Sequence, residues 1–107
     1  MKIREMISKG EPTVSFEIFP PKSSFALETV FDTLTELKDL HPDFISVTYG
    51  AGGTAQSNTV EIASRIKKDF GIESIAHLTG CTSTKEGMKR TLTSIKDSGI
   101  ENIQALL

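Results

Sequence analysis

Apolar residues recur along this chain in two alternating patterns, one typical of strands and one typical of helices. Short runs rich in β-branched and aromatic residues predict strands over 14–19, 44–49, 74–79 and 102–107. Apolar residues three or four positions apart predict amphipathic helices between these strands. An opening helix is also expected over residues 1–9, with Gly10 as its stop. The order is typical of βα units around a parallel sheet.

Capping residues mark the helix boundaries. Ser23 or Ser24 is the expected N-cap of the second helix, and a capping box over residues 83–86 is expected to open the last one. Gly71 and Gly99 follow the third and fourth helices, where a left-handed residue commonly ends a helix. The inward faces are expected to carry Ile3, Met6, Ile7, Leu27, Val30, Phe31, Leu34, Leu37, Val60, Ala63, Ile66, Phe70, Met88, Leu92 and Ile95.

Side chains alternate across a strand, so each strand has a helix-facing side and an opposite, interior side. The expected helix-facing residues of the first three strands are Val14, Phe16, Ile18, Ile45, Val47, Tyr49, Ala76 and Leu78. The expected interior residues are Ser15, Glu17, Phe19, Ser46, Thr48, His77 and Thr79. Glu17, Thr48 and His77 thus converge at the C-terminal ends of three strands, where parallel α/β folds build their sites. Three polar residues there indicate a pocket.

Glu17 is the most informative of these residues, because it lies in an otherwise apolar strand that stops at Pro20 and Pro21. A buried charged carboxyl group is costly unless it is paired or keeps its proton. The plain alternative is a solvated glutamate on an edge strand. His77 has an equally plain alternative, a core histidine hydrogen-bonded to backbone.

Composition narrows the class of protein. The 107 residues carry a net charge of −2, with 37% hydrophobic and 24% charged residues, as in an ordinary soluble domain. Without a basic surplus, nucleic acid is not an expected partner. The start lacks the apolar core of a signal peptide, and no apolar run is long enough to span a bilayer, so a cytoplasmic location and no membrane contact are expected.

Metal and nucleophile chemistry find little support in the sequence. Cys81 is the only cysteine, and His77 has no second ligand at metal-binding spacing, so no metal site is expected. The glycine-rich segment 50–53 matches neither the dinucleotide fingerprint nor the P-loop. It is either a flexible turn or a place where the backbone approaches a ligand closely.

The fourth strand begins shortly before the chain stops, and no helix follows to cover it. Parallel sheets are normally covered on both faces. We therefore expect residues 1–107 to be a single partial domain, the first part of a longer (β/α) domain. The alternative is an open four-stranded sheet that is stabilised by forming a homo-oligomer.

Three segments resemble the methylenetetrahydrofolate reductase family in order and spacing. They are residues 16–22 (FEIFPPK), 44–53 (FISVTYGAGG) and 76–79 (AHLT). The resemblance implies an α/β fold that is the N-terminal portion, about half, of a (β/α)8 TIM barrel with four of its strands. It also implies a flavoprotein that reduces 5,10-methylenetetrahydrofolate to 5-methyltetrahydrofolate, with FAD as cofactor and NAD(P)H as electron donor.

The same resemblance implies roles for individual residues. Glu17 corresponds to the family's general acid, Thr48 and His77 to flavin-contacting residues, and Leu106 to the next flavin contact. The chain departs from the family pattern at its end, where Leu107 stands at the position of an arginine that Gly-Asp normally follows. Two other readings remain open: a truncated α/β module without catalytic activity, and another folate-dependent barrel enzyme such as a methyltransferase.

Overall fold

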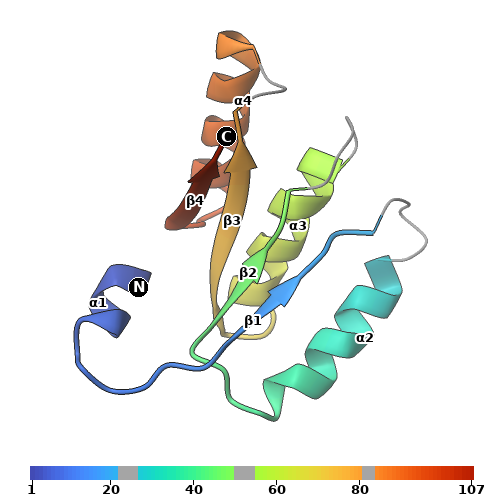
Figure 1. The fold of residues 1–107 in the computed structure, drawn as a ribbon. Helices are drawn as coiled ribbons and strands as arrows, with labels where there is room; N and C mark the ends of the chain where they lie inside the picture. The colour runs from blue at the N-terminus through green and yellow to red at the C-terminus, as the bar shows by residue number, and fades with distance from the viewer. Residues whose placement is uncertain (22–26, 50–54, 81–83) are drawn as a thin grey trace.

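The computed structural model describes residues 1–21, 27–49, 55–80 and 84–107, with backbone alone at 55–57. Helices and strands alternate along the whole chain (Figure 1). The strands are β1 Ser15–Ile18, β2 Phe44–Val47, β3 Glu73–Thr79 and β4 Asn102–Leu106. The helices are α1 Ile3–Ile7, α2 Leu27–Lys38, α3 Ala55–Lys68 and α4 Lys85–Asp97. All the expected elements are present, and α1, β1, β2 and β4 are shorter than predicted.

The four strands form one parallel sheet in the order β1-β2-β3-β4. Each strand pairs with the next one along the chain, as in a (β/α) barrel opened into a sheet. Glu17 of β1 pairs with Ser46 of β2, and Ser46 pairs in turn with Ile75 of β3. The predicted fold class, an α/β fold consistent with part of a (β/α) barrel, is confirmed.

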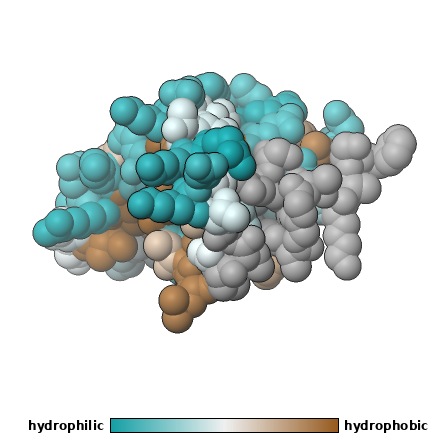
Figure 2. Space-filling model, turned by 90° about the horizontal axis from the view of Figure 1, so that it is seen from above, coloured by the Kyte–Doolittle hydropathy of each residue, from teal (hydrophilic) through white to brown (hydrophobic). Residues whose placement is uncertain are grey.

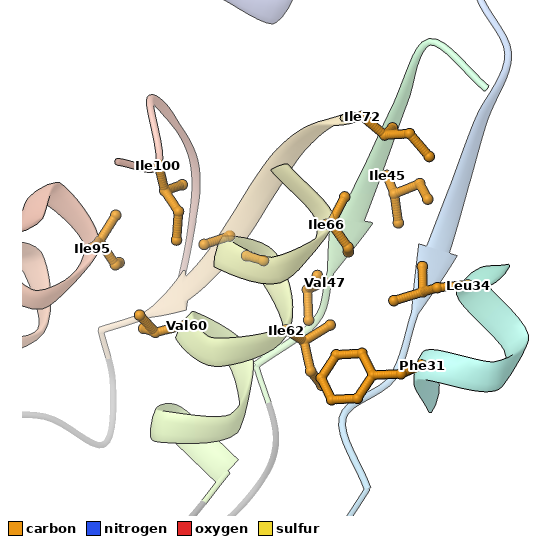
Figure 3. Close-up of a cluster of buried hydrophobic side chains, with 12 residues drawn as sticks. Phe31, Leu34, Ile45, Val47, Val60, Ile62, Ile66, Ile72, Ile95 and Ile100 are labelled. Carbon is orange, nitrogen blue, oxygen red and sulfur yellow. The ribbon is translucent and has the colours of Figure 1, made fainter. Parts of the chain in front are cut away.

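The hydrophobic core lies between the sheet and the three long helices (Figure 3). Leu34 of α2, Ile66 of α3 and Ile95 of α4 are almost inaccessible to solvent. They pack in one cluster with Ile45 and Val47 of the sheet. Burying a side chain of this size contributes about 1.5–3 kcal/mol. The helical layer therefore lies on the face that strand alternation predicted, which leaves the opposite face for the polar residues.

Several predicted positions differ from the structure. Ile7, Val14 and Leu92 were expected to face the core, but all three are exposed. Val14 precedes the strand, so strand alternation does not apply to it. On α4 the buried residues are Thr91 and Ile95, so Thr91 takes the inward position predicted for Leu92. Helix α4 also begins later than predicted, since Thr84 is its N-cap and accepts a hydrogen bond from the Gly87 amide. Ser23, Ser24 and Ser83 lie outside the described residues.

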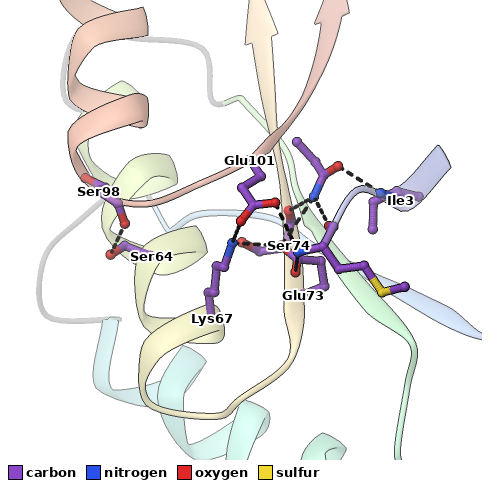
Figure 4. A network of polar contacts seen from close by, with 9 residues as sticks. Ile3, Ser64, Lys67, Glu73, Ser74, Ser98 and Glu101 are labelled. Atoms are coloured by element: carbon purple, nitrogen blue, oxygen red, sulfur yellow. Dashed lines mark hydrogen bonds and ion pairs between the residues drawn. The ribbon is translucent and has the colours of Figure 1, made fainter. Parts of the chain in front are cut away.

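A polar network fastens α1 to the amino-terminal end of the sheet (Figure 4). The Met1 amine lies 2.6 Å from Glu73 Oε2 and 3.1 Å from Glu101 Oε2. Lys67 Nζ of α3 lies 3.3 Å from Glu73 Oε1 and 3.1 Å from Glu101 Oε1. Two cations thus share two carboxylates at the amino-terminal end of the sheet, opposite the C-terminal strand ends.

Asn102, at the start of β4, completes this network with both ends of its side-chain amide. Its Oδ1 accepts a hydrogen bond from the Ile3 amide at 2.9 Å. Its Nδ2 donates to the Met1 carbonyl at 3.0 Å and to Glu73 Oε1 at 3.3 Å. One side chain therefore joins the first helix to the last strand.

These contacts set the direction of three pKa shifts. Hydrogen bonds to Glu73 and Glu101 hold the pKa of the Met1 amine above its ordinary value of 8.0. Burial lowers the pKa of Lys67, but hydrogen bonds to Glu101 and Glu73 outweigh it, so that pKa stands above 10.5. The hydrogen bond from Lys67, followed by that from the Met1 amine, holds the pKa of Glu101 below 4.5.

Candidate active site

Three neighbouring strands bring polar side chains together on the helix-free face of the sheet. The Ser46 hydroxyl of β2 donates a hydrogen bond to Glu17 Oε1 of β1 at 3.2 Å. His77 Nε2 of β3 lies 3.5 Å from the same carboxylate oxygen. The contact between Glu17 and Ser46 follows from the register, because the two residues pair and their side chains point to one face. The predicted convergence of Glu17 and His77 is therefore present.

The three residues differ in their exposure to solvent. Ser46 is 9% exposed and His77 is 6% exposed, whereas half of the Glu17 side chain is accessible. Strand β1 is an edge of the described sheet, so the alternative of an edge-strand glutamate holds in part. Glu17 nevertheless differs from an ordinary solvated glutamate, because one of its oxygens is held by a buried hydroxyl. The arrangement leaves a carboxyl group that is anchored on one side and open on the other.

His77 carries a buried polar atom that the described part of the chain leaves without a hydrogen bond. Its Nε2 has no partner within hydrogen-bonding geometry there, although Glu17 Oε1 is near. A buried donor or acceptor without a partner costs about 1–3 kcal/mol, so native proteins seldom retain one without a reason. This nitrogen is a natural contact point for a bound molecule.

Thr48 follows β2 and is held by its backbone. Its amide donates to the Ile18 carbonyl at 2.9 Å, and its carbonyl accepts from Thr59 Oγ1 of α3 at 2.9 Å. Extending the register of β2 and β3 by one residue places Thr48 opposite His77. Its side chain is half-buried. Thr48 and His77 therefore lie side by side, two residues nearer the C-terminal strand ends than Glu17.

Leu106 lies further along the same face, near the end of β4. It pairs with Thr79, whereas His77 pairs with Gln104. Its side chain is half-exposed. The register thus places Leu106 two residues beyond the level of His77, so the four predicted site residues form a staggered row rather than one contact cluster.

Sequence reasoning missed the role of Ser46. Strand alternation placed its side chain on the interior face, but it gave no indication that the hydroxyl bonds Glu17. A serine directly opposite an acidic residue in the predicted register was the available signal.

An apolar groove lies elsewhere, between the end of β1 and α2. It has a volume of about 420 Å³ and is lined by Ile18, Phe19, Pro21, Thr29, Val30 and Thr33. Phe19 was predicted to share the face of Glu17, but it is exposed and lines this groove instead. Strand geometry ends at Ile18, so the alternation does not extend to Phe19. The groove is separate from the polar site.

Among the residues coloured in the view from above, most of the surface is hydrophilic, and hydrophobic residues show mainly along its lower border (Figure 2). Among the described residues, no group of three or more His, Cys, Asp or Glu side chains is arranged to hold a metal ion. The helices described here are also too short or too polar to cross a bilayer. Cys81 and the glycine-rich segment 50–53 lie outside the described residues.

Comparison with known proteins decides the family. The sequence model of methylenetetrahydrofolate reductase matches residues 2–107. The chain belongs to the methylenetetrahydrofolate reductase family. Within this family it is 36% identical over 105 residues to methylenetetrahydrofolate reductase (NADH) 1 of Arabidopsis thaliana, which covers 98% of the chain. It is 42% identical over 92 residues, or 86% of the chain, to 5,10-methylenetetrahydrofolate reductase of Buchnera aphidicola.

The chain spans only part of these reductases. It corresponds to 18% of the Arabidopsis protein and to 32% of the Buchnera protein. The 5,10-methylenetetrahydrofolate reductase of Pectobacterium carotovorum is 38% identical over 98 residues, which make up 92% of the chain and 33% of that reductase. The matched stretch includes every strand that carries a residue of the candidate site.

Proposed function

We propose that the protein carrying this chain reduces 5,10-methylenetetrahydrofolate to 5-methyltetrahydrofolate. One observation carries the proposal beyond family membership: Glu17 is held by Ser46 and lies beside His77 on the helix-free face of the sheet. Membership of the methylenetetrahydrofolate reductase family names the substrate class. The name of the Arabidopsis relative includes NADH, which supports a nicotinamide as the electron donor.

Glu17 is the proposed general acid of this reaction. The folate substrate carries its methylene group as a bridge between two nitrogens. Proton transfer from Glu17 to one of them breaks the carboxyl O–H bond, forms an N–H bond and lets the electron pair of the C–N bond pass to that nitrogen. The lone pair of the other nitrogen then forms a C=N double bond with the methylene carbon, and this iminium carbon can accept hydride. A half-exposed carboxyl group suits this role, since the acid must reach the substrate.

FAD is the proposed cofactor, and the residues present fit it. The buried Nε2 of His77 has no hydrogen-bond partner among the described residues. Thr48 lies opposite His77, and Leu106 offers a half-exposed apolar side chain further along the same face. These three residues would hold the flavin. When bound and reduced by two electrons from the nicotinamide, the flavin would supply the hydride that reduces the folate.

The test uses the intact gene product that carries this chain. We expect the purified protein to be yellow, to oxidise NADH or NADPH with menadione as acceptor, and to form 5-methyltetrahydrofolate. A colourless protein without nicotinamide oxidation would contradict the proposal. A protein without flavin that still binds reduced folate would favour the folate-dependent methyltransferase.

A second proposal concerns the 107-residue chain by itself. We infer that in isolation it is a non-catalytic α/β module, at most a weak binder. Strands β1 and β4 are the two edges of the described sheet, and the resemblance to the family implies an arginine where Leu107 stands. Titration of the isolated chain with FAD tests this inference. Tight binding by a monomer would contradict it.

A further inference from the structure

Ser46 contacts the proposed general acid, yet the mechanism above gives it no task. We propose that Ser46 is a positioning residue, which holds Oε1 of Glu17 so that Oε2 is the oxygen presented to the folate. The inference rests on the proposed function and assigns one residue within it.

The contacts of the carboxyl group are one-sided. Oε1 accepts the hydrogen bond from Ser46 at 3.2 Å and lies 3.5 Å from His77 Nε2. Within the described part of the chain, no hydrogen bond or ion pair reaches Oε2. Ser46 and His77 are both more than nine-tenths buried, whereas the Glu17 side chain is half-accessible. The buried Ser46 hydroxyl therefore holds one oxygen, and the other is left for an incoming molecule.

This asymmetry matters because the terminal torsion of a glutamate is broad and roughly two-fold. Without an anchor the two oxygens exchange places, and the proton has no fixed position. A general acid works only when its proton lies within hydrogen-bond reach of the accepting atom. The serine hydroxyl also remains as a donor to the carboxylate after the proton has left. A preorganised donor of this kind stabilises the charge that develops during the reaction.

Ser74 shows that a buried serine in this sheet can lack such a bond. It is fully buried in β3, and within the described chain its hydroxyl has no hydrogen-bond partner. It pairs with Ile45 and therefore lies on the helix-facing side, away from Glu17. Burial in a strand therefore does not by itself explain the hydrogen bond of Ser46. Ser74 provides a control, because it has similar burial and allows the same substitution.

The experiment compares Ser46→Ala, Ser46→Thr and Ser74→Ala in the intact gene product. For Ser46→Ala we expect kcat with methylenetetrahydrofolate to fall about 10-fold, the effect of roughly one hydrogen bond. The KM for the folate and the rate of flavin reduction by the nicotinamide should change little. Ser46→Thr keeps the hydroxyl and suits a strand, so it should restore most of the rate. Ser74→Ala should leave both half-reactions unchanged.

Three results would overturn the inference. They are equal slowing of both half-reactions by Ser46→Ala, a similar loss in Ser74→Ala, and no rescue by threonine. If Ser46→Ala does not fold, Ser46→Cys keeps the side-chain volume with a weaker donor and should give an intermediate rate. A wild-type protein that does not reduce methylenetetrahydrofolate would refute the proposed function itself. That result is distinct from an active wild type whose Ser46 variants are unimpaired.

Discussion

Glu17 combines two features that seldom occur together in one side chain. It lies on a strand at the edge of the described sheet, half-open to solvent, and a buried hydroxyl from the next strand holds one of its oxygens. Solvent-exposed glutamates usually populate several rotamers, because ordering a long side chain is costly in entropy. The bond to Ser46 offsets part of that cost before any substrate arrives. One oxygen of Glu17 thus has a fixed partner before any molecule binds.

Replacement of Glu17 by Gln isolates the proton from the size and polarity of the side chain. In the intact gene product, Glu17→Gln should slow the reduction of methylenetetrahydrofolate by about 10²–10⁴-fold, the usual contribution of general acid catalysis. Flavin reduction by the nicotinamide needs no proton from this group and should remain nearly intact. Stopped-flow measurement of the two half-reactions decides the matter. Exposed Glu36 of α2 provides the control, and equal slowing of both steps by Glu17→Gln would mean a structural role.

Ser74 carries a stability prediction of its own. Its buried hydroxyl lacks a partner in the described chain, so its removal leaves no other group unsatisfied. Ser74→Ala should therefore leave the free energy of unfolding unchanged or raise it by up to about 1 kcal/mol. Urea denaturation of the intact protein measures the change. A loss of more than about 1 kcal/mol would show that the hydroxyl has a partner in the folded protein.

At the scale of elements, periodicity predicted the order of helices and strands but not every buried face. Leu92 was expected inside, yet Thr91 is buried in its place. The threonine methyl can pack while its hydroxyl bonds the Gly87 carbonyl one turn earlier, at 3.0 Å. A simple apolar count cannot identify such a residue, because it treats threonine as polar. The Ser46 bond was missed for a similar reason, since alternation predicts a face and not a partner.

The network that docks α1 makes stability depend on pH. The pKa values of the Met1 amine and Lys67 are raised in the folded protein, so both cations stabilise it at low pH. The stabilisation is complete below pH 8.0 for the Met1 amine and below pH 10.5 for Lys67, and it is lost as the pH rises through each raised pKa. The lowered pKa of Glu101 stabilises the fold above 4.5, and this is lost as pH falls through the lowered value. The network is therefore complete from about pH 4.5 to pH 8.

The corresponding variant is Glu101→Gln. Its urea midpoint should lie below that of the wild type throughout this pH window, and the gap should close as pH falls beneath 4.5. Glu36→Gln, at an exposed position of α2 that forms no ion pair within the described chain, should show no such pattern. A gap that persists unchanged to pH 3 would rule out the ion pairs as its cause.

At the scale of the whole molecule, the sheet has two bare edges in its described part, β1 and β4. Ile103 and Leu106 of β4 are half-exposed, and an apolar groove lies beside β1. Exposed strand edges pair readily with other chains. We expect the isolated 107-residue chain to self-associate, which sedimentation velocity over a range of concentrations will detect. Ile103→Lys should weaken the association, Glu36→Lys should not, and a monomer at every concentration would contradict the prediction.

The fold was accessible from the sequence because local signals and global order agree. Strand starts about 30 residues apart, with helices between them, leave few topologies other than sequential parallel pairing. The site was accessible in part, since alternation put Glu17 and His77 on one face. The register sets two features of the site: it pairs Glu17 with Ser46, and it places Leu106 beyond His77. Both depend on how far neighbouring strands are shifted along one another. No single strand specifies that shift.

Asn102 has a consequence for how the protein is made. Its side-chain amide bonds the Ile3 amide and the Met1 carbonyl. These two residues precede Asn102 in the sequence by 99 and 101 residues, respectively. During synthesis the first helix leaves the ribosome well before the strand that anchors it exists. Within residues 1–107, helix α1 is therefore translated before β4, and it gains its contacts with Asn102 only after β4 has been translated. Until β4 has been translated, residues 1–3 of this chain lack the side chain that holds them in the folded structure.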